Sequence, residues 1–354
     1  MFDAFLGSGQ GTRYIYCFAN GRCETMERLI IICVVISFLA AWVMTRKWIR
    51  KAPEVGLLGF DMNKPGRPKV AEMGGIGVLF GFGLGMLIYI GIMTFWLDRP
   101  NYVSILAALS TVLITCIIGI MDDLLGWKKG LRQWQKPIFT LFAALPVVVV
   151  NEGQSVMNMP IVGPIDWGTL YPLLIVPIGI VGASNVYNMV AGYNGLEAGM
   201  GVIILSTMSY FAFKSGNQNA MMLALCMVAA LLAFLHFNWC PAKVFPGDTM
   251  TYSVGALAAC VAILGDMEMI ALILFVPYAI DFFLQIRSRF KSEAFAKVNA
   301  DGSLDKQSKG TYHLTHLALS VLKRVKGRVY ERDVVLFLYG IELLAAGCCM
   351  LIYI

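Results

Sequence analysis

Long apolar runs separated by short polar segments are the feature that most constrains how this 354-residue chain folds. About 20 consecutive apolar residues span the hydrocarbon core of a bilayer. Because backbone groups in lipid must be satisfied within the segment, each run is expected to form a helix. We place about ten runs, at 29–45, 74–96, 102–121, 137–151, 170–188, 197–213, 219–237, 250–264, 269–286 and 334–353. The chain is therefore predicted to be an all-α polytopic membrane protein with about ten transmembrane helices.

The composition agrees, since 58% of the residues are hydrophobic and only 14% are charged. The first 28 residues are interpreted as a polar N-terminal tail, because the polar stretch 7–13 separates Met1 from any apolar core and does not resemble a secretory signal. Residues 29–354 are interpreted as a single transmembrane domain, in which 287–333 form a long polar loop. Pro160, Gly163 and Pro164 among apolar residues suggest a small external β-hairpin near 155–165.

The basic residues predict the orientation. If the runs alternate across the membrane, the loops on one side hold 23 of the 28 Lys and Arg residues; these loops are 46–73, 122–136, 189–196, 238–249 and 287–333. Basic loops favour the cytoplasmic side, so both termini are predicted outside. The net charge of +6 then comes from these basic loops, and it favours attraction to anionic lipid or substrate. No basic–aromatic motif indicates a nucleic-acid partner.

A polar signature interrupts the apolar pattern at Asn185-Val-Tyr-Asn188-Met-Val-Ala-Gly192-Tyr-Asn194-Gly195-Leu-Glu197-Ala-Gly199. Irregular backbone at membrane depth occurs where it lines a cavity. Asn185 and Asn188 lie three apart, on one helix face, and Gly192 and Gly195 allow a backbone to approach a ligand closely. We interpret the stretch, with Asn194 and Glu197, as a binding site. An ordinary loop between helices is the alternative.

Two carboxylates, Asp122 and Asp123, end the third run, and Lys136 precedes the fourth. Acids at such depth are costly and suggest function. Neighbours on a helix diverge by roughly 100°, so one carboxylate could orient a metal or substrate while the other handles a proton. Lys136 is placed to hold a phosphate. Helix termination and a topology marker are the alternative interpretations. Glu72, beside the Gly-Gly that opens the second run, is a candidate pocket wall.

The motif Val244-Phe245-Pro-Gly247-Asp248-Thr249 follows the seventh run. Its carboxylate and hydroxyl suit oxygen ligation of Mg²⁺, and Phe245 could stack on a base. Loop filling by Phe245 and helix capping by Asp248 or Thr249 are the alternatives. His313 and His316 are three apart without a third ligand, and we interpret them as not metal-binding.

Together these residues describe a nucleotide-diphosphate site: acids for Mg²⁺, cations for phosphate and a ring for a base. No P-loop or dinucleotide fingerprint is present. A site of this kind at the bilayer surface suggests that the second substrate is a lipid.

Here the sequence resembles the polyprenyl-phosphate N-acetylhexosamine-1-phosphate transferases, and within them the branch acting on UDP-GlcNAc and dolichyl phosphate. The resemblance covers nearly the whole chain from about residue 29. It rests on four pieces in order: residues 59–72 with Asp61, Asn63 and Lys64; Asp122-Asp123; residues 185–199; and Asn238-Trp239 followed by residues 244–249.

The resemblance implies a ten-helix enzyme with a cytoplasmic active site. It would transfer sugar-1-phosphate from a UDP-N-acetylhexosamine to polyprenyl or dolichyl phosphate, release UMP and use Mg²⁺, with Mn²⁺ as an alternative. This is the first membrane step of glycan assembly such as protein N-glycosylation. By position, Asn188 and Asp248 look like the Mg²⁺ and pyrophosphate ligands, Asn194 and Phe245 like the uracil site, and Lys136 like a contact for the lipid phosphate. Asp122 and Asp123 match the paired acids, and Glu72 matches an acid near the nucleotide-sugar pocket.

Two departures concern the last polar loop. The muramoyl-pentapeptide branch carries a histidine cluster in this loop, and the pair His313 and His316 does not reproduce it. The eukaryotic enzymes carry an arginine pair that contacts the donor. The candidates for that contact in this chain are Arg289, Arg287, Lys291 and Lys297. A phospho-MurNAc-pentapeptide-type transferase stays the alternative within the family. A transporter is the alternative from another class, although no internal repeat of the signature occurs. A homodimer and a plasma-membrane or endoplasmic-reticulum location are further expectations.

Overall fold

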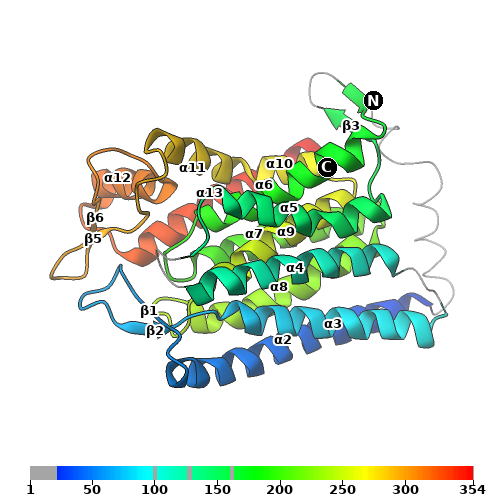
Figure 1. Cartoon of the computed structure of the whole chain (residues 1–354), viewed down its shortest axis with the longest axis horizontal. Coiled ribbons are helices and arrows are strands. Elements are labelled where there is room, and N and C mark those ends of the chain that lie inside the picture. Colours follow the sequence, from blue (N-terminus) through cyan, green and yellow to red (C-terminus); the bar gives the residue numbers. More distant parts are fainter. Residues whose placement is uncertain (1–21, 99–101, 126–129, 160–162, 354) are drawn as a thin grey trace.

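The structure is a computed structural model, and it describes residues 22–98, 102–125, 130–159 and 163–353. Figure 1 shows the long helices lying side by side, with one β-hairpin at one end of the bundle and two hairpins and a short helix at the other. The elements, in chain order, are α2 (Arg22–Glu54), β1 (Leu58–Phe60), β2 (Lys69–Ala71), α3 (Gly75–Phe95), α4 (Val103–Leu125), α5 (Gln135–Val150), β3 (Val156–Met159), β4 (Gly163–Asp166), η1 (Tyr171–Ile175), α6 (Val176–Met189), α7 (Leu196–Ser215), α8 (Gln218–Asn238), α9 (Gly247–Leu264), α10 (Glu268–Leu274), α11 (Val276–Arg287), β5 (Lys297–Val298), β6 (Leu304–Asp305), α12 (Leu314–Lys326) and α13 (Glu331–Tyr353).

The all-α polytopic membrane fold predicted from the sequence is confirmed. Eight helices in the described residues are long and apolar enough to cross a membrane, and α10 and α11 make a ninth span if this pair, bent by 55°, counts as one. The apolar helix α5 takes the place of the run 137–151, and its 16 residues reach only about 24 Å at 1.5 Å per residue. The predicted runs therefore correspond to helices, with α5 as the short one.

Several boundaries and one region differ from the sequence prediction. Helix α2 continues to Glu54, nine residues past the predicted end at 45, because its basic last turns are good helix formers once outside the apolar layer. The region 287–333 is more than a loop, since it holds the β5–β6 hairpin and α12. The external hairpin expected near 155–165 is confirmed by the antiparallel pairing of β3 with β4; its residues 160–162 lie outside the described residues.

Helix α9 is the centre of the bundle. Every residue from Thr249 to Leu264 is buried, and the helix contacts α3, α4, α6, α7, α8 and α10. Small residues permit this packing. A Cβ atom added at Gly119 of α4 would lie 2.6 Å from backbone atoms of Asp248 and Thr249, so the missing side chain is what lets α4 reach the first turn of α9.

The β1–β2 hairpin is tied to the segment that leads into α9. Phe245 N donates to Ala71 O at 2.7 Å, and Gly74 N donates to Phe245 O at 2.9 Å. An isolated parallel bridge joins Ala71 to Val244. The two segments, about 170 residues apart in sequence, are thus fixed against each other at the end of the bundle that carries β1, β2, β5, β6 and α12 (Figure 1).

Replacing Gly119 with Ala tests the close approach of α4 and α9. The added methyl group must displace backbone, so we expect a loss of about 1–3 kcal/mol of stability, measured as a lower thermal midpoint in detergent. Gly83→Ala in α3 is the matched control, because a Cβ atom added there would have no neighbour within 4 Å. Equal midpoints for the two variants would show that α4 and α9 do not meet this closely.

Candidate active site

Three elements bring four charged side chains together, and we call this group the acid–lysine cluster: Asp122, Asp123, Lys136 and Asp248. The Lys136 ammonium lies 2.8 Å from Asp122 Oδ2 and 3.2 Å from Asp248 Oδ2. Asp122 Oδ1 also accepts from Leu131 N at 2.6 Å. Removing charges from water is costly unless they are paired, so the lysine between Asp122 and Asp248 offsets part of the negative charge at the end of the apolar helices.

Asp123 binds the first turn of α9, whereas Lys136 forms its ion pairs with Asp122 and Asp248. Its Oδ1 accepts from Asp248 N at 2.8 Å, and its Oδ2 accepts from Thr249 N at 3.0 Å and Thr249 Oγ1 at 2.6 Å. The residue that precedes α9, Pro246, supplies no side-chain cap. The first N–H groups of a helix lack partners within the helix and favour a negative charge. Asp123 therefore caps α9 from the neighbouring helix and positions Asp248.

The two asparagines at the end of α6 face α5 and α9. Asn188 Oδ1 accepts from Thr251 Oγ1 at 2.7 Å, one turn along α9 from Asp248. Asn185 Nδ2 donates to Thr140 Oγ1 at 2.9 Å, and Thr140 Oγ1 in turn donates to Lys136 O at 3.0 Å. Asn188 thus borders the acid–lysine cluster through Thr251, and Asn185 borders it through Thr140.

Asn194 belongs to a second group, which we call the loop network: Asp61, Asn63, Lys64, Asn194 and Glu331. Asn194 Nδ2 donates to Asp61 Oδ2 at 2.9 Å, and Asn194 N donates to Glu331 Oε1 at 2.8 Å. Lys64 forms an ion pair with Glu331, and its ammonium lies 3.7 Å from Asp61. The network joins the β1–β2 hairpin, the α6–α7 loop and the first residue of α13.

Glu197 and Gly192 hold the α6–α7 loop closed. Gly192 N donates to Glu197 Oε1 at 2.9 Å, and Asn63 Nδ2 donates to Gly192 O at 2.8 Å. Gly192 has a φ of 101°, and a Cβ there would lie 2.9 Å from the Phe295 ring. This position needs glycine both for its backbone angle and for its contact with the last polar region.

The remaining predicted residues are spread around these two groups. Glu72 is half-buried, and burial together with the Asp123 charge raises the pKa of its carboxyl group. Phe245 is half-buried next to the β2 contacts described above. Arg289 is exposed in the turn after α11, with a φ of 54°, and its side chain makes no hydrogen bond or ion pair with the described residues. The structure thus places Glu72 near the acid–lysine cluster and leaves Arg289 outside it.

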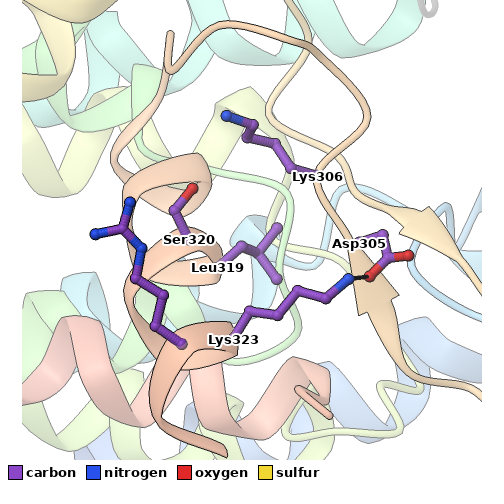
Figure 2. A pocket seen from close by; sticks show the side chains of 6 residues that line it. Asp305, Lys306, Leu319, Ser320 and Lys323 are labelled. Carbon is purple, nitrogen blue, oxygen red and sulfur yellow. Dashed lines mark hydrogen bonds and ion pairs between the residues drawn. The ribbon is translucent and has the colours of Figure 1, made fainter. Parts of the chain in front are cut away.

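Two cavities open at the same end of the bundle. One, of about 410 Å³, lies beside α12 and is shown in Figure 2, where Lys323 reaches Asp305. The other, of about 480 Å³, lies between the β1–β2 hairpin and the segment 296–300. Lys64 lines the second cavity, which therefore borders the loop network. Neither cavity contains a residue of the acid–lysine cluster.

A metal ion has few protein ligands available in this region. No group of three or more His, Cys, Asp or Glu side chains in the described residues is arranged to hold one. Asp248 and Asn188 still offer carboxylate and amide oxygens, and Mg²⁺ is usually held by one or two carboxylates, water and substrate phosphates. This donor set fits a metal that arrives with a nucleotide.

The two histidines of the last polar region have other partners. His313 Nε2 lies 3.0 Å from Ser292 O, and its Nδ1 lies 3.7 Å from Asp281. Burial lowers the pKa of His316 to about 4, so this side chain is neutral at physiological pH. Both side chains are buried at the start of α12, where His313 is the residue before the helix and His316 lies in its first turn.

Sequence reasoning misses Glu331 and Thr251 and gives Asp61 and Lys64 no role of their own. Glu331 falls within the region predicted as a polar loop, although an acid directly before an apolar run is a visible signal. Thr251 lies inside an apolar run, where a threonine that satisfies its hydroxyl within its own helix has the same sequence pattern.

Asp123→Ala tests the cap on α9. It removes the acceptor for two backbone N–H groups and one hydroxyl, so we expect a loss of about 0.5–2 kcal/mol, seen as a lower thermal midpoint. Asp123→Asn is the matched control, because it keeps one acceptor oxygen and should fall between the alanine variant and the unmodified protein. An alanine variant as stable as the unmodified protein would contradict the capping role.

Comparison with known proteins identifies the family of the chain. The family model for glycosyl transferase family 4 matches residues 105–266, which contain the whole acid–lysine cluster. A Saccharolobus solfataricus protein, provisionally named a UDP-N-acetylglucosamine–dolichyl-phosphate N-acetylglucosaminephosphotransferase, is 34% identical over 319 residues, covering 90% of this chain and 94% of its own. The Dictyostelium discoideum enzyme of that name is 27% identical over 67% of this chain and 66% of its own.

A Streptococcus thermophilus phospho-N-acetylmuramoyl-pentapeptide-transferase is 33% identical over 52% of this chain and 55% of its own. The chain belongs to glycosyl transferase family 4.

Proposed function

We propose that this membrane protein transfers N-acetylglucosamine-1-phosphate from UDP-GlcNAc to a polyprenyl phosphate such as dolichyl phosphate, releasing UMP. The observation that carries the proposal is the convergence of Asp122, Lys136 and Asp248 at the polar end of the apolar helices. The similarity to a relative named for this reaction, over 90% of this chain, supports it. The muramoyl-pentapeptide relative reported above is similar over only about half of this chain, which favours the N-acetylglucosamine reaction.

The position of the cluster suits a substrate pair of unequal solubility. UDP-GlcNAc reaches the cluster from water, and a lipid phosphate reaches it from the bilayer surface. The apolar faces of the helices exclude water from one side of the cluster, and a low-dielectric surrounding strengthens interactions with charge that develops during transfer.

The reaction is proposed as a direct displacement. An oxygen of the lipid phosphate forms a bond to the β-phosphorus of UDP-GlcNAc, the bond from that phosphorus to the bridging oxygen breaks, and UMP leaves with the electron pair. Asp122 orients the acceptor phosphate and accepts its proton if it arrives protonated. A phosphate monoester has a second pKa near 6 and is mostly deprotonated already. Positioning and electrostatics therefore supply most of the catalysis.

Mg²⁺ is part of this proposal, with Mn²⁺ as an alternative. Asp248 with Asn188 would hold the ion beside the donor, where it would supply neutralising charge for the pyrophosphate. The chain's own residues do the rest: Asp123 holds Asp248 in place through the α9 cap, and Lys136 lies 2.8 Å from Asp122 and 3.2 Å from Asp248. Lys136, placed between Asp122 and Asp248, would bind the acceptor phosphate.

Replacing Asp248 with Asn tests the site and the reaction together. Purified protein receives Mg²⁺, polyprenyl phosphate and a panel of UDP-sugars, and UMP release and lipid-linked product are measured. We expect transfer from UDP-GlcNAc by the unmodified protein and at least about a 100-fold loss in the variant, because the variant loses a charged ligand.

Asp166→Asn, at the opposite end of the bundle, is the matched control and should retain full activity. Near-normal, Mg²⁺-dependent transfer by Asp248→Asn would reject the ligand assignment. Absence of UMP release with every UDP-sugar and lipid phosphate would reject the function.

The orientation is proposed from the basic loops. The hairpins β1–β2 and β5–β6 and helix α12 lie at one end of the bundle, and they carry many of the basic residues that favour the cytoplasm (Figure 1). The active site is then cytoplasmic and both termini lie outside. The homodimer and the identity of the host membrane stay predictions.

Cysteine labelling in sealed vesicles tests this orientation. A cysteine introduced at Ser308, near α12, should react only when the cytoplasmic face is accessible to an impermeant reagent. A cysteine at Gln154, near β3, should react only from the other face. Labelling of both from one side would contradict the proposed topology.

A further inference from the structure

The cavity beside α12 is lined mainly by basic side chains. Its lining residues are Asp305, Lys306, Leu319, Ser320, Lys323 and Arg324. Lys323 forms an ion pair with Asp305, as Figure 2 shows. Lys306 Nζ donates to the backbone oxygen of Lys309 at 3.3 Å. The Arg324 side chain makes no hydrogen bond or ion pair with the described part of the chain. Two cations at the cavity, Lys306 and Arg324, therefore have no carboxylate partner among the described residues.

An exposed apolar strip runs along α12 beside this cavity. Leu317, Val321 and Val325 follow one another at four-residue intervals, which places them on one face of the helix. We call these three residues the α12 strip, and their exposed fractions are 38%, 38% and 80%. Arg324 lies three residues from Val321 and seven from Leu317, so it belongs to the same face. The helix thus presents an apolar strip directly next to a cationic cavity.

The chain holds α12 close to the membrane boundary. Residues 327–330 connect its end at Lys326 to Glu331, the first residue of the candidate membrane span α13. A connection of this length reaches at most about 18 Å. Helix α12 also contacts α13 and α11, and α11 belongs to the bent pair that can form a further span. The α12 strip is therefore placed within reach of the bilayer surface.

We propose that α12 rests on the bilayer surface and that its cavity binds the phosphate group of an anionic phospholipid. The α12 strip enters the apolar edge of the leaflet, while Lys306 and Arg324 pair with the phosphate. Interfacial helices combine an apolar face with flanking cations in this way. Helix α12 carries no acidic residue, and its last turn holds Lys323, Arg324 and Lys326. That charge suits the negative surface potential of a membrane.

This lipid site is separate from the acid–lysine cluster, because no residue of the cluster lines the cavity. It also does not depend on the proposed transfer reaction. The cavity can accept a phosphate whether or not the protein binds a nucleotide sugar.

The test is binding of two phospholipids to the full-length protein in detergent, measured by native mass spectrometry. The lipids are dioleoylphosphatidylglycerol, which is anionic, and dioleoylphosphatidylcholine, which has no net charge. We expect the unmodified protein to prefer phosphatidylglycerol. In the double variant Lys306→Gln/Arg324→Gln, the ratio of phosphatidylglycerol to phosphatidylcholine affinity should fall by about tenfold or more, because both unpaired cations are lost. An unmodified protein without this preference would overturn the proposal.

The double variant Arg46→Gln/Lys47→Gln is the matched control. It removes the same charge from two exposed cations near the end of α2, which do not line the cavity. Its affinity ratio should stay within about threefold of the unmodified value, since the effect belongs to the cavity and not to charge in general. An equal fall in both double variants would overturn the proposal.

A third double variant and a competitor distinguish a lipid from a free anion. Val321→Ser/Val325→Ser keeps the cavity cations but removes most of the α12 strip, so both phospholipids should bind about fivefold or more weakly with their ratio unchanged. Inorganic phosphate at about a hundredfold excess should displace less than half of the bound phosphatidylglycerol. Full lipid affinity in this variant, or displacement of more than half of the lipid, would show that the cavity takes a free anion and would overturn the lipid assignment.

Discussion

The fold depends most on how the charged first turn of α9 is accommodated inside an apolar bundle. Asp248 lies at the start of a helix that is buried from Thr249 to Leu264, and it would be costly there without partners. Lys136 balances its charge, and Asp123 satisfies the N–H groups of the same turn. The ends of α4, α5 and α9 are thereby fixed relative to one another, which places Asp122 against the same lysine.

The loop network extends this arrangement outward from the helix ends. Residues of the β1–β2 hairpin, the α6–α7 loop and α13 share buried hydrogen bonds and an ion pair around Asn194. Asn188, at the end of α6, borders the acid–lysine cluster, and Asn194 lies just beyond it in the loop network. A short stretch of chain therefore connects the acid–lysine cluster with the loop network.

The apolar runs predicted the helical membrane fold well, because burial in lipid leaves a strong, local pattern. They failed where the determinant was not local: α2 extends past its apolar run, and α12 lies in a region predicted as loop. For the site, charge and amide patterns identified Asp122, Asp123, Lys136 and Asp248 as a group. Only the tertiary structure separates the two aspartates, because the direction in which each carboxylate points depends on packing against α9.

A structure of the protein with UDP-GlcNAc and Mg²⁺ bound tests the central claim most directly. We predict that the pyrophosphate lies between Asp248, Asn188 and Lys136, with the uracil beside Asn194 of the loop network. A nucleotide bound away from both groups, for example in the cavity beside α12 shown in Figure 2, would contradict this prediction.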